Sequence, residues 1–584
     1  MEPTPLDPRA LGDATSAAHN SRPPAAHYLL LVLLLAFAAW SRVGLAGRMA
    51  PQRPEPDAYL ALQLDVLTDN VPSGKLAREK AERLYGAYPD FLVRPLAALV
   101  GTAAYARAPL EASLAEHLEA AARPLVTVRA WCAWICAAGV LATYLLARQW
   151  LAPRAALVAA SLVSFSLLHL TYSHQARPHA PHMTFAALAL AASAGYAARP
   201  SVARLAVAGV ALWTGFASLQ TGLFLAPAFL VALLVARTSW RAKLGALVVL
   251  GATYALAQPF HAGGIELSSD GISMANDGHA VDLSELNGRG LFATWSALWG
   301  NDPVLVVLAL LGVAAGIATA KPPSGAPRTW LVGAAYVVPY MAFALLNEST
   351  RDRYLIPLLP CLAVAAAIAV DSAAKFAGRR WELLGAALVL AALAAPVLAG
   401  LRYVFVARQP DTLQLAAAWL ERQPNSAEAR IVTSPYVVLP LAWRRAALDD
   451  APRRIADQSA WLTYQLELGG APAATALFDF TLFTPAREGR DGDEEQLGAR
   501  LDELAPTYVV LEPSRRQRSL PWHQAFERVV RAHATRVALF EPDGEDPPRE
   551  ELFEYGDILG LHSRLSRAHA FGPPLEIYLW NPRQ

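Results

Sequence analysis

Long hydrophobic runs alternate with short polar connections over the first two thirds of the chain. From Tyr28 to Leu401 these runs are rich in Ala, Leu and Val. About 20 apolar residues cross the hydrocarbon core of a membrane. Lipid-exposed backbone must also satisfy its own hydrogen bonds, so each long run predicts a transmembrane helix. The eleven predicted spans are 27–46, 128–148, 154–172, 181–198, 204–220, 222–237, 243–260, 303–320, 329–346, 354–371 and 382–401.

A twelfth run, 89–106, is interrupted near its start. Asp90, Arg94 and Pro95 all fall in its first turns. Charges and a proline at that place favour an interfacial or re-entrant helix over a full span.

The pattern changes from Arg402 onward, where the sequence is typical of a globular domain. A helical stripe predicts a helix at 411–422. Predicted strands follow at Arg430–Thr433, Thr507–Leu511, Val537–Phe540 and Glu576–Trp580. The predicted fold class is an α-helical polytopic membrane domain with about 11 spans plus an interfacial helix, followed by a C-terminal extracytoplasmic α/β domain. Its predicted parts are a disordered cytoplasmic tail at 1–26, a transmembrane domain at 27–401 and a soluble domain at 402–584.

Composition supports this division and excludes some classes of function. Of the 584 residues, 54% are hydrophobic and 17% are charged, whereas a soluble protein carries about 25% charged residues. The net charge of +1 gives no electrostatic case for nucleic-acid binding. The three cysteines lie inside apolar runs, which indicates packing and not a metal or disulfide framework.

Loop charge predicts the orientation of the spans. Positively charged short loops are typically cytoplasmic. The connections that contain Arg or Lys but no acid are 148–154, 199–204, 237–243, 321–328 and 375–380. If successive spans cross the membrane in opposite directions, these five connections all lie on the same side. This arrangement predicts a multi-pass protein of the cytoplasmic membrane. The connections 47–127, 173–180 and 261–302 and the C-terminal domain then lie outside; if 89–106 is a span, only the N-terminus changes side.

The first outer connection places an acid soon after the first span. Asp57 lies in the polar segment 54–59, together with Glu55. A carboxylate at the membrane surface can act as a general base toward an acceptor hydroxyl or amine. It can also help to hold a divalent cation on a phosphate. The alternative is a solvated loop acid, and composition alone favours that alternative.

The third and fourth predicted spans are joined by a turn rich in histidine. His174, Arg177, His179 and His182 lie in nine residues, and Pro181 suits the first turn of the following helix. Arg177 beside a helix N-terminus is typical of a phosphate site. His179 and His182 share a helix face and are candidate metal ligands. The alternative is an interfacial loop with no ligand.

A charged turn, 347–353, precedes the tenth predicted span. Arg351 and Arg353 stand at its outer end, where they can clamp a lipid phosphate. The alternative is that both side chains extend to the lipid headgroups without a specific ligand.

Four segments together carry a resemblance to a known family. They are Asp57-Ala58-Tyr59, Tyr88-Pro89-Asp90-Phe91, the run from Val128-Arg129 through Arg148 to Leu157, and Arg353-Tyr354-Leu355-Ile356-Pro357-Leu358-Leu359-Pro360. In order and topology, residues 27–401 resemble the GT-C-fold membrane glycosyltransferases. This group includes protein O-mannosyltransferases, the lipid A aminoarabinose transferase, and bacterial proteins of the family 39 or Rgt-like type.

The resemblance implies a donor sugar linked to a lipid phosphate, usually polyprenyl phosphate, and inverting transfer outside the cytoplasmic membrane. It gives Asp57 the position of the catalytic acid and Arg353 a position near the donor phosphate. Two positions depart from the family pattern. Ala58 stands where a second acid is common, and His179 stands where the fourth span often begins with an acid. Metal dependence and the detailed acid–base chemistry therefore stay open.

We therefore expect an integral-membrane glycosyltransferase that moves a hexosyl or pentosyl group from a polyprenyl-phosphate donor to a lipid, glycan or protein acceptor on the outer face. Asp57 is the expected catalytic residue, and a divalent cation is one option for a cofactor. The expected substrate-binding residues are Glu55, Tyr59, Arg129, His174, Arg177, His179, Arg351, Arg353 and Tyr354.

Two other functions remain as alternatives. One is a membrane transporter or flippase, although transporters usually carry charged or broken helices at the midplane, and the ionisable residues here gather at span ends. The other is a cell-envelope glycan polymerase or ligase, which would use the same kind of lipid donor without the first-loop acid.

Overall fold

The computed structural model divides the chain into two compact units. Unit 1 comprises Met1–Gly44, Glu79–Pro95 and Ala130–Leu401, and unit 2 comprises Leu45–Arg78, Leu96–Arg129 and Arg402–Gln584. The residues that the structure describes are 24–51, 58–68, 90–257, 265–268, 271–276, 279–319, 329–377, 382–424, 426–434, 437–450, 460–470, 475–482, 494–513, 521–544 and 561–581.

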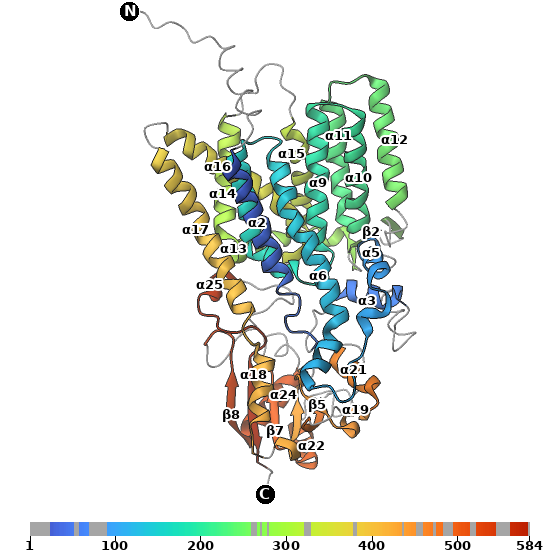
Figure 1. Cartoon of the computed structure of the whole chain (residues 1–584), viewed down its shortest axis with the longest axis vertical. Helices are drawn as coiled ribbons and strands as arrows, with labels where there is room; N and C mark the ends of the chain where they lie inside the picture. Colours follow the sequence, from blue (N-terminus) through green and yellow to red (C-terminus); the bar gives the residue numbers. More distant parts are fainter. Residues whose placement is uncertain are drawn as a thin grey trace, which may run out of the picture. The chain divides into compact units, whose positions relative to one another are not determined.

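Unit 1 is built mainly from helices (Figure 1), and their sequences are rich in apolar residues. They are α2 (Ala25–Val43), α7 (Pro153–Phe165), α8 (Leu167–Ser173), α9 (His179–Ala198), α10 (Val202–Ser218), α11 (Leu225–Val235), α12 (Trp240–Ala257), α13 (Gly290–Asn301), α14 (Pro303–Thr319), α15 (Trp330–Leu346) and α16 (Leu359–Ala377), with the 3₁₀ segments η2 (Gln220–Phe224), η4 (Leu283–Glu285) and η5 (Asp352–Leu358). Three further helices, α5 (Asp90–Val100), α6 (Leu114–Ala147) and α17 (Glu382–Ala407), run across a boundary between the units.

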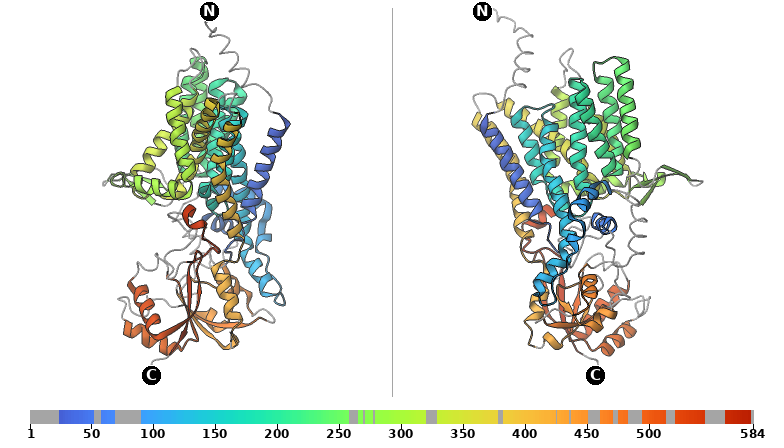
Figure 2. Two further views of the ribbon diagram at one scale, coloured as in Figure 1. Left: turned by 90° about the vertical axis from the view of Figure 1, so that its left-hand side faces the viewer. Right: turned by 45° about the vertical axis from the view of Figure 1, so that its right-hand side comes forward.

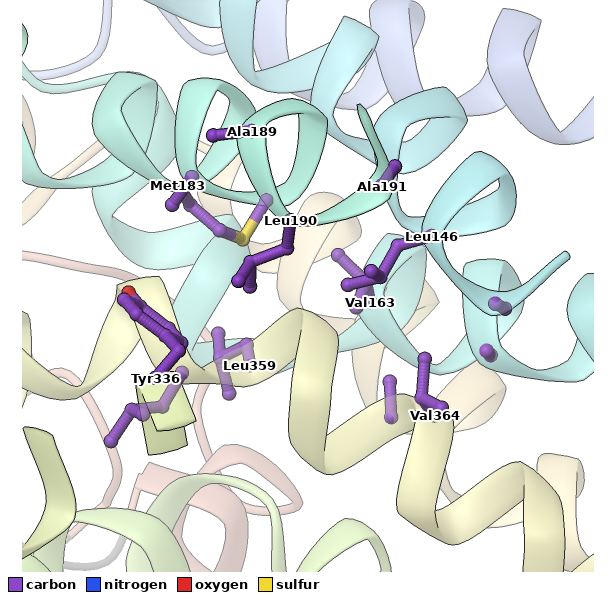
Figure 3. Close-up of a cluster of buried hydrophobic side chains, with 14 of the residues drawn as sticks. Leu146, Val163, Met183, Ala189, Leu190, Ala191, Tyr336, Leu359 and Val364 are labelled. Atoms are coloured by element: carbon purple, nitrogen blue, oxygen red, sulfur yellow. The ribbon is translucent and has the colours of Figure 1, made fainter. Parts of the chain in front are cut away.

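Small residues let these helices pack closely. Helices α9, α10, α11 and α12 run side by side (Figure 2), and α9 buries a series of alanines. Between α14 and α16, a Cβ atom at Gly312 would overlap the backbone carbonyl of Ala365. Figure 3 shows part of the resulting core, where Met183, Leu190 and Tyr336 lie near Leu359. Alanine and glycine are thus used here for close helix contact, as is common in membrane proteins.

The helices agree with a multi-pass membrane protein, but the predicted number of spans is not confirmed. Among the described residues, four segments are long and apolar enough to cross a membrane: Ala25–Val43, Leu114–Ala147, Asp352–Ala374 and Val389–Glu421. Two bent pairs raise this number to six if each pair is one span. Phe91–Tyr105, Val202–Ser218, Thr221–Val235 and Trp330–Leu346 are apolar but shorter. A total of about eleven spans stays a prediction.

One predicted span and one predicted connection have more structure than the sequence pattern indicated. The predicted span 154–172 is broken at Ser166 into α7 and α8, which meet at 56°. The 261–302 connection contains an antiparallel three-stranded sheet, β1 (Ile265–Ser268), β2 (Gly271–Asn276) and β3 (His279–Asp282), followed by α13. Hydrogen bonds from Ser166 and Leu167 to Asp302, described below, favour the break between α7 and α8 over one continuous helix.

Unit 2 contains a six-stranded mixed sheet in the order β5-β6-β4-β7-β9-β8. The strands are β4 (Arg430–Thr433), β5 (Ala442–Trp443), β6 (Leu477–Leu482), β7 (Tyr508–Leu511), β8 (Ala534–Phe540) and β9 (Leu575–Trp580). Strands β5, β6, β4 and β7 are parallel, whereas β9 is antiparallel to both β7 and β8. The four predicted strands overlap β4, β7, β8 and β9, although β8 begins at Ala534 and not at Val537.

Helices and apolar strand residues form the core of unit 2. Its helices are α3 (Tyr59–Leu67), α18 (Thr412–Glu421), α19 (Arg445–Asp450), α21 (Ala460–Leu468), α22 (Glu494–Leu504), α24 (Pro521–His533) and α25 (Leu561–Leu565), with η1 (Gly101–Tyr105) and η7 (Ser426–Glu428). Leu501 of α22 and Phe526 of α24 pack with Val509 and Tyr578 of the sheet. An Asp411–Gln414 capping box begins α18, and it accounts for the match to the helix predicted at 411–422.

Candidate active site

The break between α7 and α8 forms one side of a buried polar cluster in unit 1. Asp302, between α13 and α14, accepts a hydrogen bond from the Ser166 hydroxyl at 2.7 Å and from the Leu167 amide at 2.9 Å. Amides at a helix N-terminus have no partner within the helix, and a carboxylate there satisfies them. Asp302 therefore fixes the start of α8 and, through it, the place of Tyr172 near the other end of that helix.

A buried arginine holds the end of α2 against the same break. The fully buried Arg42 guanidinium donates to the Ser164 carbonyl at 3.0 Å and lies 2.9 Å from His169 Nδ1. Because arginine has only donors, His169 Nδ1 is the acceptor. Sequence reasoning missed this contact, although an arginine within an apolar run is itself a signal of a specific partner.

The central contact of the cluster joins α8 to η5. The Tyr172 hydroxyl donates to Asp352 Oδ1 at 2.6 Å, across 180 residues of sequence. The Arg353 amide also donates to Asp352 Oδ1, at 2.8 Å. All three residues are buried. Asp352 lies in the charged turn 347–353, and nothing in the local sequence distinguishes a buried acid from a solvated one.

Four of the predicted binding residues lie around this contact. Arg177, His179, Arg353 and Tyr354 are all buried. The His179 ring centroid is 5.5 Å from that of Tyr354, and the Arg353 guanidinium carbon is 5.0 Å from the Tyr354 ring centroid. Arg177 follows Tyr172 by five residues, and Arg353 is the residue after Asp352.

The residues of this cluster carry an excess of positive charge. Segments 172–182 and 352–358 together contain two arginines and one aspartate, so they carry a formal charge of +1 with neutral histidines. The cluster also contains the first turn of α9, where Pro181 is the third residue, and backbone amides in such a turn favour anions. The arrangement therefore suits a phosphate group.

Other predicted residues lie elsewhere or have local partners. His174, the residue after α8, has its Nδ1 atom 3.0 Å from the Leu170 carbonyl of that helix. Arg351 is exposed, so the structure does not bring it into the buried cluster with Arg353. Asp57 and Glu55 lie outside the described residues, as does the side chain of Tyr59, whose backbone begins α3.

Arg129 contacts backbone carbonyl groups in unit 2. Its guanidinium donates to the Ala46 carbonyl at 3.3 Å and to the Arg48 carbonyl at 2.6 Å. Arg48 in turn donates to the Tyr403 hydroxyl at 3.0 Å and lies 3.8 Å from the centroid of the Phe571 ring. Arg129 thus holds the segment that follows α2, and its role in substrate binding stays a prediction.

A second acid of the first outer connection has an unusual environment. The Tyr105 hydroxyl donates to Asp65 Oδ1 at 2.5 Å. Burial raises the pKa of Asp65 to about 7, while the hydrogen bond from Tyr105 acts in the opposite direction. Asp65 therefore changes its charge near neutral pH, which its sequence context does not reveal.

The histidine pair predicted as candidate metal ligands has other contacts. His182 Nδ1 lies 2.7 Å from the Ser218 hydroxyl of α10, while the His179 ring faces Tyr354. Within the part of the chain that the structure describes, no group of three or more His, Cys, Asp or Glu side chains is arranged to hold a metal ion. The carboxylates at 55 and 57 are not among those residues, so a divalent cation stays a prediction.

Comparison with known proteins gives one family match. Residues 121–260 match the family model described as dolichyl-phosphate-mannose-protein mannosyltransferase, a GT-C family. The match covers α7, α8, the histidine-rich turn and α9. It confirms, over these residues, the resemblance to GT-C glycosyltransferases that the sequence motifs indicate. Among curated proteins, no sequence match was found.

Several solved structures are similar at low identity. The archaeal oligosaccharyltransferase AglB from Archaeoglobus fulgidus, in complex with an inhibitory peptide and a dolichol-phosphate, is 12% identical with a TM-score of 0.48, covering 88% of this chain and 73% of its own. The arabinofuranosyltransferase AftD from Mycobacteria is 17% identical with a TM-score of 0.43, covering 97% and 40%. ArnT from Cupriavidus metallidurans in the apo state is 16% identical with a TM-score of 0.38, covering 67% and 69%. These values are too low to carry an inference about substrates or site residues.

Proposed function

We propose that the protein is a membrane glycosyltransferase that takes a sugar from a polyprenyl-phosphate donor. The acceptor is a lipid, glycan or protein on the outer face of the cytoplasmic membrane. The observation that carries this proposal is a pair of buried arginines, Arg177 and Arg353, that lie within five residues of the hydrogen-bonded Tyr172 and Asp352, respectively. Half of that cluster lies in the segment that matches the mannosyltransferase family.

The cluster supports the proposal through its charge and its position at the ends of apolar helices. A lipid phosphate brings negative charge to the edge of a membrane, where a buried guanidinium can pair with it. The backbone amide of Arg353 donates a hydrogen bond to the Asp352 side chain, and this bond holds Arg353 at the start of η5. In our proposal Arg353 and Arg177 bind the phosphate that leaves when the sugar is transferred.

Asp57 supplies the acid–base chemistry in this proposal. The acceptor oxygen or nitrogen forms a bond to the anomeric carbon while the bond from that carbon to the phosphate oxygen breaks. Asp57 takes the acceptor proton, and the lipid phosphate leaves with the bonding electrons. A carboxylate at the reacting centre also stabilises the positive charge of an oxocarbenium-like transition state.

The test is a transfer assay in membranes with a panel of labelled polyprenyl-phosphate sugars. We expect the wild type to transfer at least one of them and Asp57→Asn to lose about a hundredfold or more of that rate, as is usual when a general base is removed. Membrane abundance of the variant should be unchanged.

Asp69→Asn is the matched control, because it removes another acid of the same connection. It should retain transfer. If the wild type transfers no sugar from the panel, or if Asp57→Asn keeps full activity, the assignment is wrong.

A further inference from the structure

Helix α13 has an exposed face made of large apolar side chains. Leu291, Phe292, Trp295 and Trp299 are between 44% and 74% exposed. The rings of Trp295 and Trp299 stack with centroids 5.2 Å apart. The sequence of α13 contains no charged residue. An exposed apolar face of this kind would be exceptional on a water-soluble protein. It indicates that α13 contacts lipid or another apolar surface.

The direction of α13 indicates that this contact is with the membrane interface. The helix meets α14 at 113°, which is not far from a right angle. Exposed apolar side chains continue along α14 at Leu310, Leu311, Val313 and Ile317. If α14 runs into the hydrocarbon core, α13 lies across its end, close to the membrane plane. Tryptophan is enriched at that level, where its ring meets both lipid and water.

The start of α13 is fixed to the turn that leads into η5. The Gly288 amide donates to the Leu346 carbonyl at 2.9 Å, and the Glu348 amide donates to the Glu285 carbonyl at 2.9 Å. Arg289 forms an ion pair with Glu348 at 3.3 Å.

The helix itself is held by closer contacts with α15. A Cβ atom at Gly290 would overlap the backbone carbonyls of Ala344 and Asn347, and the Thr294 hydroxyl donates to the Ala344 carbonyl at 3.3 Å. Helix α13 also contacts η5 directly. Any change in the depth of α13 should therefore move η5 as well.

We propose that α13 is an interfacial helix whose aromatic face lies in the headgroup region of the bilayer, and that it sets the depth of η5 in the membrane. Arg353 is then held at the level of a lipid phosphate. The role given to Arg353 rests on the proposed function, whereas the interfacial position of α13 does not. The occupant of the exposed face is thus the phospholipid interface itself.

The depth of α13 can be measured with nitroxide labels on the full-length protein in phospholipid vesicles. Labels are attached at Trp295→Cys and Trp299→Cys in a background with Cys361→Ala, because Cys361 is the one native cysteine among the three that is not fully buried. Leu310→Cys is the control for hydrocarbon and Glu428→Cys, on an exposed part of unit 2, is the control for water.

Collision of the labels with oxygen and with a water-soluble nickel chelate reports their depth. We expect labels at 295 and 299 to give values between those of the two controls. Chelate accessibility equal to that at 428 would show that the face is in water and would overturn the proposal. Oxygen accessibility equal to that at 310 would place it in hydrocarbon and would overturn the interfacial assignment.

The effect on η5 is tested with the double variant Trp295→Ala/Trp299→Ala. A label at Ser349→Cys, which is exposed beside η5, should become more accessible to the chelate in this variant. The KM for the lipid donor should rise by about threefold or more with little change in kcat, as expected when only binding is weakened. An unchanged label at 349 refutes the coupling. A changed label at 349, together with no transfer of any donor sugar by the wild type, instead refutes the proposed function and leaves the membrane anchor in place.

Discussion

Replacing Tyr172 with phenylalanine removes one hydroxyl from the centre of the buried cluster. That hydroxyl donates to Asp352 Oδ1 at 2.6 Å, and both residues are buried. The ring that remains fills almost the same volume, so packing should be preserved. The Arg353 amide still donates to the same oxygen at 2.8 Å, and the variant therefore isolates one hydrogen bond.

The expected cost follows from the charge of the acceptor. A hydrogen bond to a charged group contributes about 1.5–3 kcal/mol to stability. Since 1.4 kcal/mol is a factor of ten in an equilibrium constant, the equilibrium constant between the ordered and a displaced position of η5 should fall by about tenfold or more. If η5 holds the donor phosphate, the KM for the lipid donor should rise, and the unfolding temperature in detergent should fall.

Tyr336→Phe is the matched control. Tyr336 is also fully buried in unit 1, but its hydroxyl donates to the neutral carbonyl of Pro357, another residue of η5, at 3.4 Å. A bond of that length to a neutral acceptor contributes at most about 0.5–1.5 kcal/mol. The assay is donor-dependent transfer together with thermal unfolding of both variants. Equal effects of Tyr172→Phe and Tyr336→Phe would refute the idea that the contact with Asp352 is the stronger of these two contacts with η5.

Two further predictions concern other parts of the chain. Gly290→Ala should sharply reduce folded protein in membranes, because its Cβ atom would overlap the Ala344 carbonyl; Gly251→Ala, with open space around it, should give wild-type yield by size-exclusion chromatography. The pKa of Asp65 is raised by burial to about 7 from 3.8, so the folded state binds the proton more tightly than the unfolded state. Its contribution to stability should be complete below about pH 4 and should be lost as the pH rises to about 7. Asp65→Asn should remove this dependence of the unfolding temperature between pH 5 and pH 8, and an unchanged pH profile would contradict the assignment.

Much of the secondary structure could be predicted because it depends on local pattern. The strand expected at Arg430–Thr433 is β4, and the expected helix at 411–422 contains α18. The span expected at 154–172 was wrong as a single helix. Its hydrophobicity is continuous, but the Ser166–Asp302 hydrogen bond favours a break. Hydropathy cannot detect a bond between residues that are 136 positions apart.

The sequence by itself determined that this is a helical membrane protein with a glycosyltransferase-like segment, and it marked Arg177, His179 and Arg353 as candidates. Apolar runs and local motifs suffice for that, because lipid requires helices wherever the chain crosses it. Only the tertiary structure decided that Tyr172 and Asp352 pair with each other. Their contact spans 180 residues, and whether an acid is buried and paired depends on which helices pack together, a property that no local sequence pattern contains.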